Sequence, residues 1–155
     1  MSRKKDTYTY DECFEQVRTM ARLFGLMFYH FSNLAVEEMG EKKGKEFVAK
    51  VVKRFGLERA KRVKAEVKKL GLKPTLENYG KVLDLPRIGW GGSTRETFCP
   101  FAEVWMEKGA EDLCKLYCDV DIWKFVGYSS KIKVKRLKSV LEGDSDCAYD
   151  VKEEK

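Results

Sequence analysis

The sequence predicts an α+β fold, with N-terminal helices packed on a small antiparallel β-sheet formed by the C-terminal half. Apolar residues recur at helical spacing through residues 11–82, whereas residues 131–140 and 147–152 alternate apolar and polar side chains. A segment rich in proline and glycine, residues 83–101, separates the two patterns. We expect a flexible tail over residues 1–9 and a single domain over residues 10–155.

The first expected helix begins near Asp11, where Thr9 or Asp11 itself can cap it, and ends at Gly40. Residues 23–31 are almost wholly apolar, so we expect this part of the helix to be buried on all sides.

Two further helices are expected over residues 41–55 and 57–70, because Gly56 and Gly71 stand where left-handed C-caps belong. Pro74 prevents the second from continuing, and Thr75 can cap a short helix that runs to residue 82.

The remaining elements follow from turn residues and periodicity. Pro100 suits the first position of a helix over 101–107, directly after an expected strand over 94–99 that ends at Cys99. Gly109 separates that helix from a run over 110–125. We then expect a turn over 127–130, a strand over 131–140, a turn at EGDSD and a last strand over 147–152.

The composition of the 155 residues limits the function classes. With 43% hydrophobic residues the chain is not disordered, and no apolar run approaches the roughly 18 residues of a membrane span. The N-terminus has no apolar stretch typical of a secretory signal, so we expect a cytoplasmic protein without a membrane partner. In that compartment cysteines are thiols or metal ligands rather than disulfides.

The net charge of +6 comes from one segment. Residues 41–73 hold 13 basic and 4 acidic residues, which makes nucleic acid a partner to consider. Their lysines lie opposite an apolar stripe, however, and no aromatic residues interleave with them to stack bases. This favours a solvated helix face over a nucleic-acid surface.

Four of the five cysteines fall in the last third of the chain and are the main functional candidates. Cys99 precedes a helix start, where free backbone N–H groups and the helix dipole favour a thiolate. Cys114 and Cys118 are four residues apart, so they would share one helix face, and Cys147 follows a tight turn.

Three interpretations of these cysteines stay open. They can be small core residues, since free cysteine is often buried. Four thiolates, from Cys99, Cys114, Cys118 and Cys147, also match the ligand count of structural zinc or an iron–sulfur cluster. Thirdly, Cys99 can be a catalytic nucleophile with Asp121 as its acid–base partner.

His30 is the only histidine and lies between Tyr29 and Phe31 in the most apolar part of the first helix. These neighbours favour a buried core residue. A neutral imidazole can also carry a proton or bind a metal, so His30 is a further catalytic candidate.

Several segments resemble the L-2-amino-thiazoline-4-carboxylic acid hydrolase family: TFCPFAEVW, LCKLYCDVD and VKRLKSVLEGDSDCAYDV, together with GKEFVAKVVKRFGLERAKRV and TLENYGKVLDLP. The resemblance covers nearly the whole chain from about residue 10. It implies hydrolytic opening of a cyclic, amidine-like thiazoline ring on a route to cysteine. The positions that match are Cys99, Cys118, Asp121 and Cys147, and Cys114 matches less closely.

A more distant resemblance is to 4-vinyl reductase-type small-molecule-binding domains, which also end in a Gly-Asp-x-x-Cys turn. Zinc-binding members carry an acidic residue and a further cysteine just before that turn, where this chain has Arg136 and Ser139. A zinc site here would have to use Cys99, Cys114 or Cys118.

Three functions therefore compete. The first is a small-molecule hydrolase that acts on a carbon–nitrogen or carbon–sulfur bond, through a Cys99 thiolate or through a metal-bound hydroxide. The second is a non-catalytic metal- or iron–sulfur-binding sensor or carrier. The third, a nucleic-acid-binding module, is disfavoured. A small molecule is the expected ligand, and a homodimer is one of the assemblies the sequence leaves open.

Overall fold

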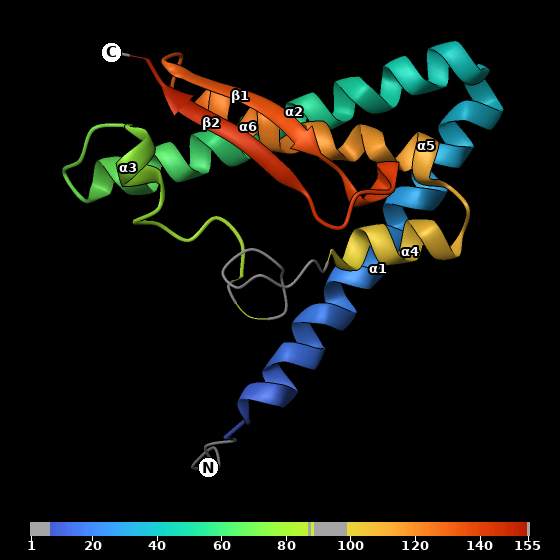
Figure 1. The fold of residues 1–155 in the computed structure, drawn as a ribbon, viewed down its shortest axis with the longest axis horizontal. Helices are drawn as coiled ribbons and strands as arrows, with labels where there is room; N and C mark the ends of the chain where they lie inside the picture. The colour runs from blue at the N-terminus through green and yellow to red at the C-terminus, as the bar shows by residue number, and fades with distance from the viewer. Residues whose placement is uncertain (1–6, 87, 89–98, 155) are drawn as a thin grey trace, which may run out of the picture.

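The computed structural model describes residues 7–86, 88 and 99–154. Helices come first and a two-stranded antiparallel sheet comes last, which confirms the α+β class (Figure 1). The elements are α1 (Tyr10–Met39), α2 (Glu41–Lys69), α3 (Leu76–Tyr79), α4 (Pro100–Glu107), α5 (Glu111–Cys114), the 3₁₀ helix η1 (Lys115–Asp119), α6 (Val120–Tyr128), β1 (Ile132–Lys138), the 3₁₀ helix η2 (Val140–Glu142) and β2 (Ala148–Glu153).

Helix α1 begins and ends where the sequence predicts. The Thr9 hydroxyl accepts a hydrogen bond from the Glu12 backbone N–H, and the Glu12 carboxylate accepts one from the Thr9 N–H at 2.7 Å. This capping box satisfies two N–H groups that the first helical turn leaves free. At the other end Gly40, with φ of 77°, turns the chain directly into α2.

The expected break at Gly56 is wrong, because α2 runs unbroken from Glu41 to Lys69. Gly56 is needed for packing instead of capping. A Cβ atom there would lie 2.6 Å from the Trp123 Cβ and 2.9 Å from the Val120 carbonyl oxygen on α6. Its missing side chain therefore lets α2 and α6 approach closely.

Several other expected boundaries can be compared. Gly71 has the predicted left-handed conformation, with φ of 72°, and Thr75 caps α3, which ends at Tyr79. Pro100 occupies the first turn of α4 as expected. The strand expected over 94–99 lies outside the described residues except for Cys99, whose backbone is extended.

The single helix expected over residues 110–125 is wrong. The chain forms α5, then the five-residue 3₁₀ helix η1, and then α6, which continues to Tyr128. Because a 3₁₀ helix has three residues per turn, positions four apart no longer lie on one face. This change places Cys114 and Cys118 in different surroundings.

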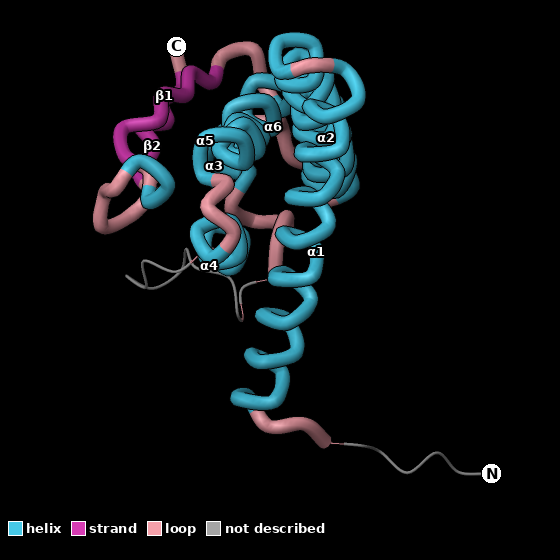
Figure 2. The backbone as a smooth tube through the Cα atoms, turned by 90° about the vertical axis from the view of Figure 1, so that its right-hand side faces the viewer, coloured by secondary structure: helices cyan, strands magenta, loops and turns pink. Residues whose placement is uncertain are grey.

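The sheet lies on α6, and α6 lies on α2, so three layers are stacked (Figure 2). β1 and β2 pair antiparallel, with Val134 opposite Val151 and Arg136 opposite Tyr149. A register shift follows Arg136 at the end of the ladder. The two strands thus place Arg136 and Tyr149 side by side near η1.

Two apolar clusters hold these layers together. One joins α1, α2, α4 and η1 around Phe28, Phe101, Trp105 and Tyr117. The other joins the C-terminal half of α2 to α6 and β1 around Tyr128.

The expectation that residues 23–31 are buried on all sides is wrong. Phe28 is buried, but Leu23 and Met27 expose 55% and 60% of their surface. In the described part of the chain no helix carries an apolar run long enough to cross a bilayer.

Candidate functional site

Asp121, in the first turn of α6, is a negatively charged residue that acts electrostatically on several buried polar groups. Its carboxylate lies close enough to influence the titration of Arg59, Cys99, Tyr117, Cys118 and Tyr149. Arg136 acts on Cys118 and Tyr149, and Cys147 acts on these two and on Cys99. We call these eight residues the Asp121 cluster: Arg59, Cys99, Tyr117, Cys118, Asp121, Arg136, Cys147 and Tyr149.

The cluster forms because five segments end or turn at one place. Cys99 is the N-cap of α4, Cys118 lies in η1, and Asp121 follows one turn later. Arg136 and Tyr149 are paired across the sheet, and Cys147 immediately precedes β2. Segments that are distant in the sequence therefore bring an acidic side chain, a basic side chain and several thiols into one cluster.

The sheet is tied to η1 by two contacts beside Cys118. The Tyr149 hydroxyl donates a hydrogen bond to the Cys118 carbonyl oxygen at 3.2 Å. Arg136 Nη1 lies 3.4 Å from the Asp119 carboxylate and keeps a side-chain exposure of 23%. The pKa of Cys118 is accordingly lowered by the positive charge of Arg136 and raised by the negative charge of Asp121, although burial has the largest effect and raises it.

Behind Asp121 lies a buried ionic network. Lys124 Nζ contacts the Asp121 carboxylate at 2.6 Å and that of Asp84 at 3.8 Å. Asp84 also accepts hydrogen bonds from Arg59 Nη2 at 2.6 Å and from the Tyr79 hydroxyl at 2.7 Å. Both side chains of the Arg59–Asp84 pair are less than 10% exposed, so the network is a rigid support for one side of the cluster.

The thiol of Cys99 experiences opposing influences. Burial raises its pKa, the backbone N–H groups of Ala102 and Phe101 lower it, and the neighbouring Cys147 and Asp121 raise it further. The helix N-terminus acts as the sequence suggests, but burial outweighs it and the net pKa is raised. Cys99 is therefore a protonated thiol at neutral pH in the unliganded protein.

The other members differ in accessibility and charge. Burial is the main cause that raises the pKa of Cys118, Tyr117 and Tyr149 above their ordinary values. Cys147, by contrast, is exposed, and its Sγ accepts a hydrogen bond from the Val140 N–H at 3.5 Å. A reagent from solution meets Cys147 first.

Cys114 stands apart from the other three late cysteines. It is fully buried in the apolar cluster with Phe28 and Trp105, and burial raises its pKa to about 12. Glu111 is the neighbouring acidic charge that raises it further. Cys99 and Cys118 pack against the edge of the same apolar cluster and are only partly buried.

Metal binding gains no support from the described residues. Across residues 7–86, 88 and 99–154, no group of three or more His, Cys, Asp or Glu side chains is arranged to hold a metal ion. Zinc or an iron–sulfur cluster on Cys99, Cys114, Cys118 and Cys147 therefore stays a prediction from the sequence.

The expectation that His30 is a buried core residue is wrong, because its side chain is exposed on α1 beside the Tyr29 ring. Within the part of the chain that the structure describes, no recorded contact joins His30 to Asp121 or to the cysteines. Its suggested role as a proton carrier stays a prediction.

Four members of the Asp121 cluster are not predicted as site residues from the sequence: Arg59, Tyr117, Arg136 and Tyr149. One signal for Arg59 was available, since it stands among Gly56, Ala60 and Val63 on the apolar side of α2. A charged residue in a buried stripe needs a buried partner. The roles of the other three depend on tertiary contacts that no local pattern reveals.

The fold and the cluster define an α+β protein with a polar, thiol-containing group of side chains where η1, α4, α6 and the sheet meet. Comparison with family models identifies it more closely. The chain belongs to the L-2-amino-thiazoline-4-carboxylic acid hydrolase family, whose model matches residues 18–151. No curated protein and no solved structure matches the chain.

Proposed function

We propose that the Asp121 cluster opens the ring of a small thiazoline-type carboxylic acid by hydrolysis. The family description supports this class of substrate. Such a molecule carries an amidine-like group that can be positively charged and a carboxylate that is negative. The observation that carries the proposal is that Asp121 and Arg136, of opposite charge, both act electrostatically on the Cys118 thiol and the Tyr149 phenol.

In this proposal the charges orient the substrate. Asp121 accepts hydrogen bonds from the amidine-like nitrogen atoms, and Arg136 donates to the carboxylate. Arg136 is suited to this because its contact to Asp119 is long, at 3.4 Å, and leaves guanidinium donors free to form shorter hydrogen bonds. Two-point binding of this kind fixes the ring carbon relative to the thiols.

Cys99 is the proposed nucleophile. Its Sγ adds to the electrophilic ring carbon, and its proton passes to the Asp121 carboxylate. Asp121 then returns that proton to the ring heteroatom that leaves, which opens the ring and leaves a covalent intermediate on Cys99. Water attacks the intermediate, releases the product and restores the thiol, so the net reaction consumes one water.

The raised pKa of Cys99 is consistent with this order of events. A bound cationic group would take the place of solvent beside the thiol and lower its pKa. The N–H groups of Phe101 and Ala102 at the start of α4 would then stabilise the thiolate. The nucleophile would thus form when substrate is present.

Ring opening of 2-amino-thiazoline-4-carboxylate by the purified chain, followed by chromatography, tests the proposal. Asp121→Asn should lower kcat by a factor of about 10² to 10⁴, because the proton acceptor and donor is lost. Asp112→Asn is the matched control, since Asp112 is 95% exposed on α5 and outside the cluster. A wild-type chain that leaves the ring intact, or an Asp121→Asn variant as active as the control, would contradict it.

A further inference from the structure

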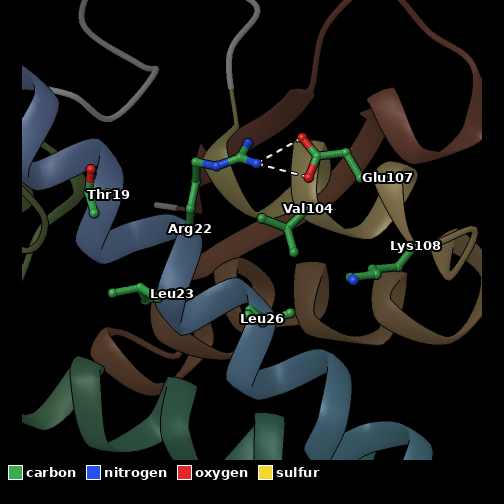
Figure 3. Close-up of a pocket in the computed structure, with 7 residues that line it drawn as sticks. All are labelled: Thr19, Arg22, Leu23, Leu26, Val104, Glu107 and Lys108. Carbon is green, nitrogen blue, oxygen red and sulfur yellow. Dashed lines mark hydrogen bonds and ion pairs between the residues drawn. The ribbon is translucent and has the colours of Figure 1, made fainter.

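A pocket with a volume of about 320 Å³ lies between α1 and the C-terminal half of α4. We call it the α1–α4 pocket, and the residues that line it are Thr19, Arg22, Leu23 and Leu26 of α1 and Val104, Glu107 and Lys108 of α4 (Figure 3). None of them belongs to the Asp121 cluster, whose member Cys99 lies at the opposite end of α4. Small-molecule pockets have volumes of about 300 to 1,000 Å³, so this one has room for a small ligand.

The middle of the α1–α4 pocket is apolar. Val104 is only 4% exposed and belongs to the apolar cluster around Phe28, and Leu26 packs against the same cluster. These two side chains are therefore held in place by the core. Leu23 is more exposed and forms the outer part of the wall. Such a wall favours a ligand with a hydrocarbon portion, because contact removes apolar surface of both from water.

Most of the charged groups at the pocket neutralise one another. Arg22 pairs with Glu107 at 2.8 Å, as Figure 3 shows, and with Glu103 at 2.6 Å. Glu103 is also paired with Arg18, at 3.1 Å. Two arginines of α1 therefore alternate with two glutamates of α4. This ionic chain joins the two helices at one side of the pocket and leaves no net charge there.

Lys108 supplies the positive charge that remains at the pocket. Its side chain is exposed at the end of α4, and its Nζ lies 6.0 Å from the centre of the Tyr29 ring on α1, so it extends from one helix to the other. Figure 3 shows the ammonium group directed toward Leu26, beside the apolar wall. Within the part of the chain that the structure describes, no ion pair joins Lys108 to a carboxylate. Its ammonium is available to an anion from solution.

We infer that the α1–α4 pocket binds a small carboxylate that carries a short hydrocarbon chain. The carboxylate pairs with the Lys108 ammonium, and the chain lies along Leu23, Leu26 and Val104. Thr19 marks the far end of the pocket, two helical turns before Leu26, so the chain has roughly 10 Å available along α1. This site is separate from the Asp121 cluster, and the inference does not depend on ring opening.

Titration of the ¹⁵N-labelled full chain with hexanoate, followed by amide chemical shifts, tests the inference. We expect saturable shifts around the middle of α1 and the end of α4, with a Kd of about 1 mM, because so small a ligand makes few contacts. Butanoate has two CH₂ groups fewer and should bind about tenfold more weakly. Hexylammonium has the same chain with the opposite charge, and it should also bind at least tenfold more weakly.

Two variants and their controls test the roles of charge and wall separately. Lys108→Met should weaken hexanoate binding by about tenfold, whereas Lys50→Met, at an exposed lysine of α2, should leave it unchanged. Leu23→Glu should weaken binding as well, because it places a negative charge at the wall. Leu70→Glu, at a leucine 57% exposed at the end of α2, is its control. Circular dichroism checks that each variant keeps its helices.

Four results would overturn the inference. The first is the absence of saturable shifts with hexanoate up to about 10 mM. The second is hexylammonium binding as tight as that of hexanoate, which would make a carboxylate rather than Lys108 the main contact. The third is equal hexanoate affinity in Lys108→Met and Lys50→Met. The fourth is a set of shifts confined to residues of the Asp121 cluster, which would place the carboxylate at that site instead.

Discussion

The ammonium group of Lys124 lies 2.6 Å from the Asp121 carboxylate, and the Lys124 side chain is only 13% exposed. The same ammonium lies 3.8 Å from Asp84, which is held by Arg59 and Tyr79. Lys124 therefore connects the proposed acid–base residue to a buried ionic network, so the orientation of Asp121 depends on residues that need not touch a substrate.

Lys124→Met should lower kcat for ring opening by about tenfold or more, because the Asp121 carboxylate loses the contact that orients it. Lys124→Arg should restore most of that loss, since a guanidinium can reach the same carboxylate. KM should change less than kcat in Lys124→Met if Lys124 only positions Asp121. Equal kcat in all three proteins would show that Lys124 has no positioning role.

The Arg59–Asp84 pair should be a major contributor to stability. Asp84→Ala leaves the buried guanidinium of Arg59 unpaired, which is expected to cost about 3–5 kcal/mol in the free energy of unfolding. Urea denaturation measures it. Glu58→Ala is the matched control, because Glu58 pairs with Lys61 at the surface and both are more than 70% exposed. Its effect should stay below about 1 kcal/mol.

The same pair predicts how stability depends on acid. Burial raises the pKa of Asp84, but hydrogen bonds from Arg59 and Tyr79 and the charges of Arg59 and Lys124 outweigh it, so the pKa lies below the ordinary 3.8. The stabilisation that the ionised Asp84 carboxylate provides is present at pH values above its ordinary pKa. It is lost as the pH falls through the lower pKa that Asp84 has in the folded protein. Asp84→Asn should therefore flatten the wild-type decline in stability below about pH 4. A decline as steep as that of the wild type would contradict this assignment.

Gly56 offers a test of the close contact between α2 and α6. Gly56→Ala should destabilise the protein by about 1–3 kcal/mol although alanine favours helix, because its Cβ would overlap atoms of Trp123 and Val120. Gly80→Ala serves as the comparison, since the nearest atom to a Cβ there is 3.9 Å away. The packing role of Gly56 would be refuted if the Gly56→Ala variant unfolded at the same temperature as the Gly80→Ala variant or at a higher one.

Thiol accessibility predicts an order of chemical modification. Iodoacetamide at pH 8 should label exposed Cys147 well before Cys114 and Cys118, whose pKa values burial raises and whose thiols are covered. Peptide mass spectrometry at increasing times measures the order. Early labelling of Cys114 would mean that the apolar cluster around it opens readily.

Local chemistry explains what the sequence predicts correctly. Thr9, Gly40, Thr75 and Pro100 act on the backbone of their own turn, so their positions alone locate helix boundaries. Gly56 also looks like a boundary, but its role depends on Trp123, 67 residues later. No local pattern distinguishes a capping glycine from one that lets two helices touch.

The residues of the candidate site also differ in how far local sequence predicts their place in the structure. Cys99, Cys118, Asp121 and Cys147 lie near enough to act on one another electrostatically, and their roles in a site stay a prediction. Cys114 does not join them, because the helix changes to 3₁₀ geometry between Cys114 and Cys118 and so changes which residues share a face. His30 looks like a core residue from its neighbours, yet its side chain is exposed on α1.

The most direct test of the proposed function is intact-protein mass spectrometry after rapid acid quenching of the chain with 2-amino-thiazoline-4-carboxylate. The account predicts a transient covalent adduct that peptide mapping places on Cys99. Cys99→Ser should abolish both the adduct and ring opening, whereas Cys13→Ser on α1 should retain both. Wild-type turnover by the Cys99→Ser variant, with no adduct at any time, would contradict the account.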